Sequence, residues 1–295
     1  MKRRRVKSKK ISLLTDFFIA LIITVIMFSV TTIIKPRVGE QNNYIKPNDI
    51  FSKKDRKRKN QNKSLANEIL EKYKIEVAYG KDTEDNVDSL DATPLLDEEI
   101  IYNNILKLRD TLEKYPEGFF NEFKNESNNY SVSIYLVDKF NSRNVALATR
   151  NTNNEFKIYI SNDEEFEKVL HHELYHIIEY YIKLEYDIDD LYKKWEEYNP
   201  NSYVYPNNVN DLDDKYTPNI NKADRVYFVS KYAKTNAKED RAETFSDMMS
   251  KEVKPYYYSK EHPILDKANL IADVIEATFD SVKEETKERW ERFLK

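Results

Sequence analysis

The stretch VLHHELYHIIEYY, residues 169–181, carries two histidines four positions apart and a glutamate directly after the first of them. On a helix, the apolar side chains of this stretch gather on one side, whereas His172 and His176 lie together on the opposite side. Two imidazoles at positions i and i+4 can hold one zinc ion, and Glu173 can reach a water molecule at that ion. The stretch therefore predicts an active-site helix with two histidine ligands and Glu173 as a general base.

Composition limits the chemistry that can accompany such a helix. The chain has 295 residues, no cysteine, three glycines and a formal net charge of −4. Thiol nucleophiles, disulfides and Cys-ligated zinc sites are excluded, and three isolated glycines cannot build a P-loop or a dinucleotide-binding loop. Basic and acidic residues are mixed through the body, so no nucleic-acid partner is expected. We expect one main domain whose site uses histidine and carboxylate groups.

The N-terminus has a different character from the body. A basic block at residues 1–10 precedes an apolar run from Phe17 to Ile34, which is about the minimum length for a membrane-spanning helix. This charge asymmetry predicts a cytoplasmic tail at residues 1–10, a transmembrane anchor at 11–34 and an extracytoplasmic body. A cleaved signal peptide would begin in the same way and would give a secreted protein. We favour the anchor because the apolar run does not end in small residues.

The segment 35–63 contains KKDRKRKNQNK and has the composition of an extended polar linker. A solvated spacer and a contact with anionic lipid or wall polymer both remain open for it. The body is expected to span residues 64–295.

Elements of the body follow from the spacing of apolar residues. Helices are expected at 64–73, at 95–115, over the histidine stretch, at 237–253 and from residue 264, with irregular structure around residues 200–218. Strands are expected at 74–79, 130–138, 144–150 and 156–161, and the last three should be adjacent and antiparallel. A small sheet followed by helices indicates an α+β fold.

A third zinc ligand must come from another part of the chain. The metzincin pattern is excluded because Glu179 stands where its glycine would be, and the next histidine is His262. His262 precedes a proline and is typical of a turn or surface residue. His171 points in a different direction from His172 and is expected to neighbour the site without binding metal. A carboxylate is the remaining choice.

Two glutamates one helical turn apart offer that carboxylate. KEDRAETFSDMM, residues 238–249, places Glu239 and Glu243 on one helix face, beside an apolar face. One of them could bind zinc while the other hydrogen-bonds a ligating histidine. The alternative is a solvated acidic helix surface.

The segment KYAKTNAKEDRAETF, residues 231–245, resembles the third-ligand segment of the lethal-factor-like metallopeptidases, a gluzincin group that includes the secreted Pro-Pro endopeptidases. In that group a tyrosine stands seven residues before the ligating glutamate, an asparagine lies between them, and Ala-Glu-x-Phe follows. Tyr232, Asn236, Glu239 and Glu243 occupy these places. The resemblance covers about residues 166–249. It implies a zincin-like fold with Glu239 as the third ligand.

The resemblance also implies roles outside the ligand set. Tyr232 would donate a hydrogen bond to the oxyanion, although a packed core tyrosine is the alternative. An antiparallel edge strand should lie beside the active helix; FKIYIS, residues 156–161, is the candidate, and an extended substrate could add to it. Two departures leave Pro-Pro specificity open: Tyr175 stands where members often have glycine, and Asp240-Arg241 replaces an aromatic pair.

The sequence therefore predicts a membrane-anchored, outward-facing zinc endopeptidase. We expect a monomer that holds one zinc ion per chain and acts on a peptide or protein substrate. A zinc-binding surface adaptor without turnover is the first alternative, although a purely structural site needs no general base such as Glu173. A surface interaction module without metal is the second.

Overall fold

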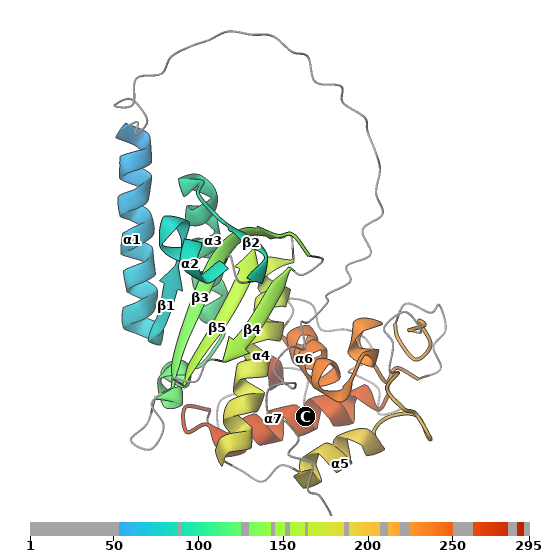
Figure 1. Ribbon diagram of the computed structural model, residues 1–295. Coiled ribbons are helices and arrows are strands. Elements are labelled where there is room, and N and C mark those ends of the chain that lie inside the picture. The colour runs from blue at the N-terminus through green and yellow to red at the C-terminus, as the bar shows by residue number, and fades with distance from the viewer. Residues whose placement is uncertain are drawn as a thin grey trace, which may run out of the picture.

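The computed structural model describes residues 53–87, 90–124, 130–142, 145–150, 154–162, 165–185, 189–206, 212–218, 225–249, 262–282 and 288–291. These residues form a mixed α+β fold with one small sheet and several helices (Figure 1), which confirms the expected class. The expected basic tail and transmembrane anchor lie outside the described residues. Among the helices that are described, none combines the length and apolar character needed to cross a membrane.

The sheet contains five strands in the order β1-β3-β5-β4, with β2 also pairing with β3. The strands are β1 (Ile75–Ala78), β2 (Ala92–Pro94), β3 (Ser131–Phe140), β4 (Ala146–Arg150) and β5 (Glu155–Ser161). β1 and β5 run parallel to β3, whereas β2 is antiparallel to β3 and β4 is antiparallel to β5. The three expected strands of this region exist, but β3 and β5 are parallel and the expectation that all three are antiparallel is wrong.

The connections explain this arrangement. β4 and β5 follow one another closely in the sequence and pair antiparallel, and Asn154, just before β5, has a φ of 61°. The chain leaves β3 and first makes β4 one strand further out, and then returns to insert β5 between the two. Ile158 of β5 therefore lies opposite Ile134 on one side and Ala148 on the other.

β5 is consequently an inner strand, and FKIYIS is not the edge strand expected from the sequence. Both of its hydrogen-bonding edges are occupied, by β3 and by β4. A substrate cannot add to it without displacing one of these strands. The antiparallel edge strand is β4, which pairs with β5 alone among the described residues.

The α-helices are α1 (Lys53–Tyr73), α2 (Glu84–Val87), α3 (Glu98–Leu112), α4 (Phe166–Glu185), α5 (Asp189–Glu197), α6 (Ala237–Met248) and α7 (Ile264–Thr278). α3, α4, α6 and α7 lie where the sequence predicts helices. The sequence predicts no element at α2, β2 or α5. Figure 1 shows α1 beside β1 at one end of the sheet, while α4 contacts β4, β5 and α6.

α1 begins at Lys53, within the segment expected to be a linker, rather than at Ser64. Contacts with α3 account for the earlier start. Arg58 lies 4.0 Å from the centre of the Tyr102 ring and donates two hydrogen bonds to Glu99, at 2.8 and 2.9 Å. Asn62 Nδ2 donates to a carboxylate oxygen of Glu98 at 2.8 Å. Polar side chains that would otherwise be solvated thus hold the first turns of α1 against its neighbour.

The sheet has a buried side chain layer on each face. On β5, Phe156, Ile158 and Ile160 join the large core formed with α3, α4 and α7. Tyr159 points to the opposite face, where its ring stacks on that of Tyr135 at 4.7 Å within a smaller apolar cluster. Burial of both faces gives the central strands little freedom to shift, so the sheet is a rigid support for α4.

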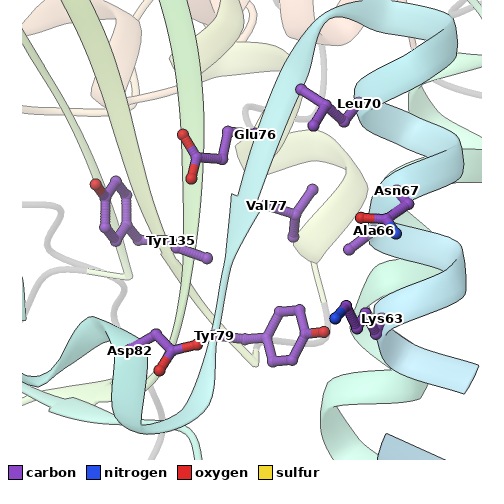
Figure 2. A pocket seen from close by; sticks show the side chains of 10 residues that line it. Lys63, Ala66, Asn67, Leu70, Glu76, Val77, Tyr79, Asp82 and Tyr135 are labelled. Atoms are coloured by element: carbon purple, nitrogen blue, oxygen red, sulfur yellow. The ribbon is translucent and has the colours of Figure 1, made fainter. Parts of the chain in front are cut away.

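An open groove of about 410 Å³ lies at the β1 end of the sheet, between α1 and β1 (Figure 2). Its walls are polar: Figure 2 shows the Tyr79 hydroxyl pointing toward Lys63, with Glu76 and Asp82 further along the groove. No residue of α4 or α6 lines it. The groove is therefore separate from the histidine helix.

Candidate metal centre

Three ligand atoms converge where α4 meets α6. His172 Nε2 lies 3.0 Å from Glu239 Oε2 and 3.1 Å from His176 Nε2, and His176 Nε2 lies 3.3 Å from the same glutamate oxygen. Ligand atoms arranged tetrahedrally about zinc, with bonds of about 2.0–2.1 Å, lie roughly 3.3 Å from one another. The three side chains are also buried, at 6% exposure or less. Their spacing, burial and donor types fit a zinc ion.

The periodicity of α4 places the histidines. Leu170, Leu174 and Ile178 are fully or almost fully buried on the core side of the helix, as the sequence predicts. His172 and His176 are one turn apart on the side that faces α6, with their rings at 87° to each other. The apolar stripe fixes the rotation of α4 about its own axis, and this rotation aims both imidazoles at α6.

His171 and His262 lie outside this cluster. His171 Nδ1 is 2.9 Å from the hydroxyl of Tyr115, which lies in the large core, and burial holds the pKa of His171 well below its ordinary value. His262 Nδ1 accepts a hydrogen bond from the backbone N–H of Val226 at 2.9 Å and so fastens a loop to the start of α7. Neither side chain joins the group of possible metal ligands within the described residues.

The first turn of α6 places Glu239. Asn236 caps the helix, and its side-chain oxygen accepts hydrogen bonds from the backbone N–H groups of Lys238 and Glu239, both at 3.0 Å. The asparagine of the resemblance is therefore an N-cap that sets where the helix begins. Glu239 and Glu243 are 1% and 8% exposed, so the alternative of a solvated acidic surface is excluded for this pair.

Glu243 holds His172 from the side opposite the cluster. Its Oε1 lies 2.9 Å from His172 Nδ1, and its Oε2 accepts a hydrogen bond from Ser230 Oγ at 2.7 Å. Ser230 Oγ in turn accepts from the backbone N–H of Ala233 at 3.0 Å. These hydrogen bonds fix the imidazole of His172 with Nε2 facing His176 and Glu239, as outer partners of metal ligands do. No sequence motif marks Ser230, which the sequence analysis missed.

The electrostatics of the cluster favour a cation. Burial lowers the pKa of His172, but its hydrogen bonds to Glu239 and Glu243 outweigh burial and raise the pKa to about 10. Burial raises the pKa of Glu239, yet the hydrogen bonds from His172 and His176 bring it well below its ordinary value. The carboxylates are thus ionised, and the site attracts positive charge, whether a proton on His172 or a metal ion.

Glu173 is fully buried beside the cluster, and its negative charge contributes to the raised pKa of His172. Within the described residues, no protein donor reaches either of its carboxylate oxygens. A buried carboxylate without a donor is rare in folded proteins and calls for an explanation by function or by a bound group. A role in proton transfer at a metal site provides one.

Tyr232 lies on the short 3-10 helix η6 (Tyr232–Lys234), just before α6. Its ring centre is 6.0 Å from that of His172, and the side chain is only partly buried. Burial and the negative charges of Glu239 and Glu173 hold its pKa far above the ordinary value. The hydroxyl therefore keeps its proton at neutral and moderately alkaline pH and can act as a hydrogen-bond donor. Its place beside the histidines disfavours the alternative of a packed core tyrosine.

The two residues after Glu239 point away from the cluster. Asp240 Oδ2 accepts a hydrogen bond from Tyr205 at 2.8 Å. It also accepts one from Trp195 of α5 at 2.9 Å and one from Lys267 of α7 at 2.6 Å. Arg241 donates to Glu179 of α4 through two nitrogens. The pair that departs from the aromatic residues of the resemblance thus fastens α6 to its neighbours. In the sequence these two charges stand only as a departure from the resemblance, and nothing there marks them as buried.

Comparison with known proteins gives a distant likeness. No protein-family model matches the chain, and no curated protein matches it. Among solved structures, the fold is similar to that of a "putative zinc-binding metallo-peptidase" from Bacteroides caccae, with a TM-score of 0.48 and 16% identity. The likeness covers 76% of this chain and 87% of that one. Because it is so distant, we base the assignment of function on the geometry of the site.

Proposed function

We propose that the protein is a zinc-dependent endopeptidase that holds zinc through His172, His176 and Glu239. One observation carries the proposal: the three ligand atoms converge within 3.0–3.3 Å next to the buried carboxylate of Glu173. When bound, zinc supplies Lewis acidity toward a water molecule and a peptide carbonyl. A site used only for stability would need no such carboxylate, which disfavours a zinc-binding adaptor.

The chain's own residues supply proton transfer and orientation. Glu173 accepts a proton from the attacking water at its carboxylate and passes it to the nitrogen of the leaving amine. Glu243 keeps His172 in one orientation throughout, because Ser230 fixes the other oxygen of the same carboxylate. Tyr232 keeps its hydroxyl proton and donates a hydrogen bond to the oxyanion that develops on the carbonyl oxygen. This combination supports the lethal-factor-like gluzincin group as the family.

β4 replaces FKIYIS as the proposed strand for substrate pairing. It is an antiparallel edge strand, it contacts α4, and its outer edge pairs with no strand of the described part. An extended peptide that adds to this edge would run beside the histidine helix and bind through its main chain. If the peptide binds in this way, N-methylation of its backbone amides near the scissile bond should raise KM.

We further propose that the protein acts as a monomer, anchored in the membrane by residues 11–34 with the catalytic body outside. The basic block at residues 1–10 and the apolar run after it support this placement. The substrate class is a peptide or protein outside the cytoplasm. Secretion after cleavage of the N-terminal segment is the alternative location.

The test is zinc content and cleavage of a mixed peptide library by the purified full-length chain. Glu173→Gln should keep about one zinc per chain and lose turnover. Glu167→Gln is the matched control, because Glu167 lies on the same helix and pairs with Lys114 away from the cluster. Zinc without turnover in all three proteins would favour the adaptor, and no zinc in any of them would refute the metal site.

A further inference from the structure

A second buried contact joins the two helices that carry the candidate zinc ligands. Arg241 Nε and Nη2 lie 2.7 and 2.6 Å from Glu179 Oε1. Glu179 follows His176 by three residues on α4, and Arg241 follows Glu239 by two residues on α6. Both side chains are almost fully buried, at 3% and 6% exposure. An ion pair of this kind ties the helices together within one turn of the ligands.

The position of this pair along α4 is informative. Apart from the ligand atoms themselves, polar contacts between α4 and α6 join Lys168 O with Ser246 Oγ, His172 Nδ1 with Glu243 Oε1, and Glu179 Oε1 with Arg241. The ligand atoms lie between the second and the third of these contacts. The first two join the helices before the ligands, and the ion pair joins them beyond His176. Without it, the helices could separate at the His176 end.

The surroundings hold the pair in one geometry. The guanidinium carbon of Arg241 lies 5.7 Å from the centre of the Trp195 ring, and Lys183 Nζ lies 3.5 Å from the same oxygen of Glu179. A planar guanidinium that donates from two nitrogens fixes orientation as well as distance, which a lysine ammonium cannot do. A buried ion pair contributes little net stability, so its use for holding a defined arrangement is the better account.

We propose that Glu179 and Arg241 are a positioning pair that sets the separation of α4 and α6 at His176 and thereby the affinity of the site for zinc. The proposal rests on the proposed function, because it takes the cluster to be the zinc site. Neither side chain touches the reacting atoms. Residues that orient metal ligands from outside typically change metal affinity by about 10- to 100-fold when they are removed.

The experiment measures the zinc dissociation constant of the full chain by competition with a chelator, together with the Tm of the metal-free and zinc-loaded forms. Arg241→Lys keeps the charge but loses the two-nitrogen contact, and Glu179→Gln keeps the shape but loses the charge. Each should weaken zinc binding about 10- to 100-fold and reduce the rise in Tm on zinc addition. Arg241→Lys should keep metal-free folding.

Glu99→Gln is the matched control. It removes a two-nitrogen contact with Arg58 that joins α1 to α3, two helices without ligands, and it should leave zinc affinity unchanged. Zinc affinity equal to wild type in both test variants would overturn the proposal. Loss of the metal-free fold in both would also overturn it, since the pair would then be needed for folding itself. A wild-type chain that binds no zinc would refute the proposed function first.

Discussion

Zinc affinity should rise steeply with pH because zinc must displace a proton from His172. In the metal-free protein the hydrogen bonds to Glu239 and Glu243 raise the pKa of this imidazole to about 10, so at neutral pH both ring nitrogens carry hydrogen. Zinc binds the neutral imidazole only. Each pH unit below 10 therefore weakens apparent binding about tenfold, or about 1.36 kcal/mol. Between pH 7 and pH 9 the dissociation constant should fall about 100-fold.

The assay is chelator-buffered zinc titration at several pH values, with proton release measured by calorimetry in buffers of different ionisation enthalpy. About one proton should leave per zinc bound at pH 7 to 9. Glu243→Gln keeps a hydrogen-bond acceptor beside His172 but removes one of the charges that raise its pKa. The pKa of His172 should be lower in the variant, so its dissociation constant should stop falling at a lower pH than that of the wild type. A flat profile in the wild type, or a plateau at the same pH in both proteins, would refute the account of His172.

Further outcomes follow from other parts of the site. Protonated His172 should contribute its full stabilisation to the metal-free protein below pH 6.5, the ordinary pKa of histidine. This stabilisation should decrease as the pH rises toward the folded-state pKa of about 10. Thermal unfolding from pH 6 to pH 10 measures the decrease. Glu173→Gln should lower kcat by about 100-fold or more while zinc content stays the same, which steady-state kinetics and metal analysis separate. Tyr232→Phe should lower kcat by about 100-fold with little change in KM, and a changed KM with normal kcat would contradict the oxyanion role. Lys267→Met should destabilise the protein by about 3–5 kcal/mol in denaturant unfolding because Asp240 is left buried without its cation; a loss below about 1 kcal/mol would show that the pair is not needed.

Helical periodicity in the sequence predicted much of the structure. The apolar spacing in α4 predicted the core face of that helix, and the same spacing predicted that His172 and His176 lie together. The motif at residues 231–245 identified Glu239 and Glu243 as neighbours of the histidines, and the structure brings these side chains together. Such patterns are local, so they survive without knowledge of the rest of the fold.

Strand order and buried charge could not be predicted in this way. Strands β1, β3, β4 and β5 were predicted and β2 was not, and the insertion of β5 between β3 and β4 depends on long-range pairing that strand composition does not encode. In α6, Asp240 and Arg241 resemble surface residues, because charged side chains are almost never fully buried unless they are paired. Their partners, Lys267 and Glu179, are distant in sequence, and nothing in the local segment reveals them.

The contact between Asp240 and Lys267 also bears on how the sequence can evolve. Both side chains are wholly inaccessible to solvent. Replacing one of them leaves a lone charge in the core, whereas replacing both by apolar groups of similar volume is often neutral or stabilising. A single substitution at either position is therefore destabilising, and the two residues must be replaced at nearly the same time. Descendants of a common ancestor should carry both charges or neither, so these positions should change together although 27 residues separate them.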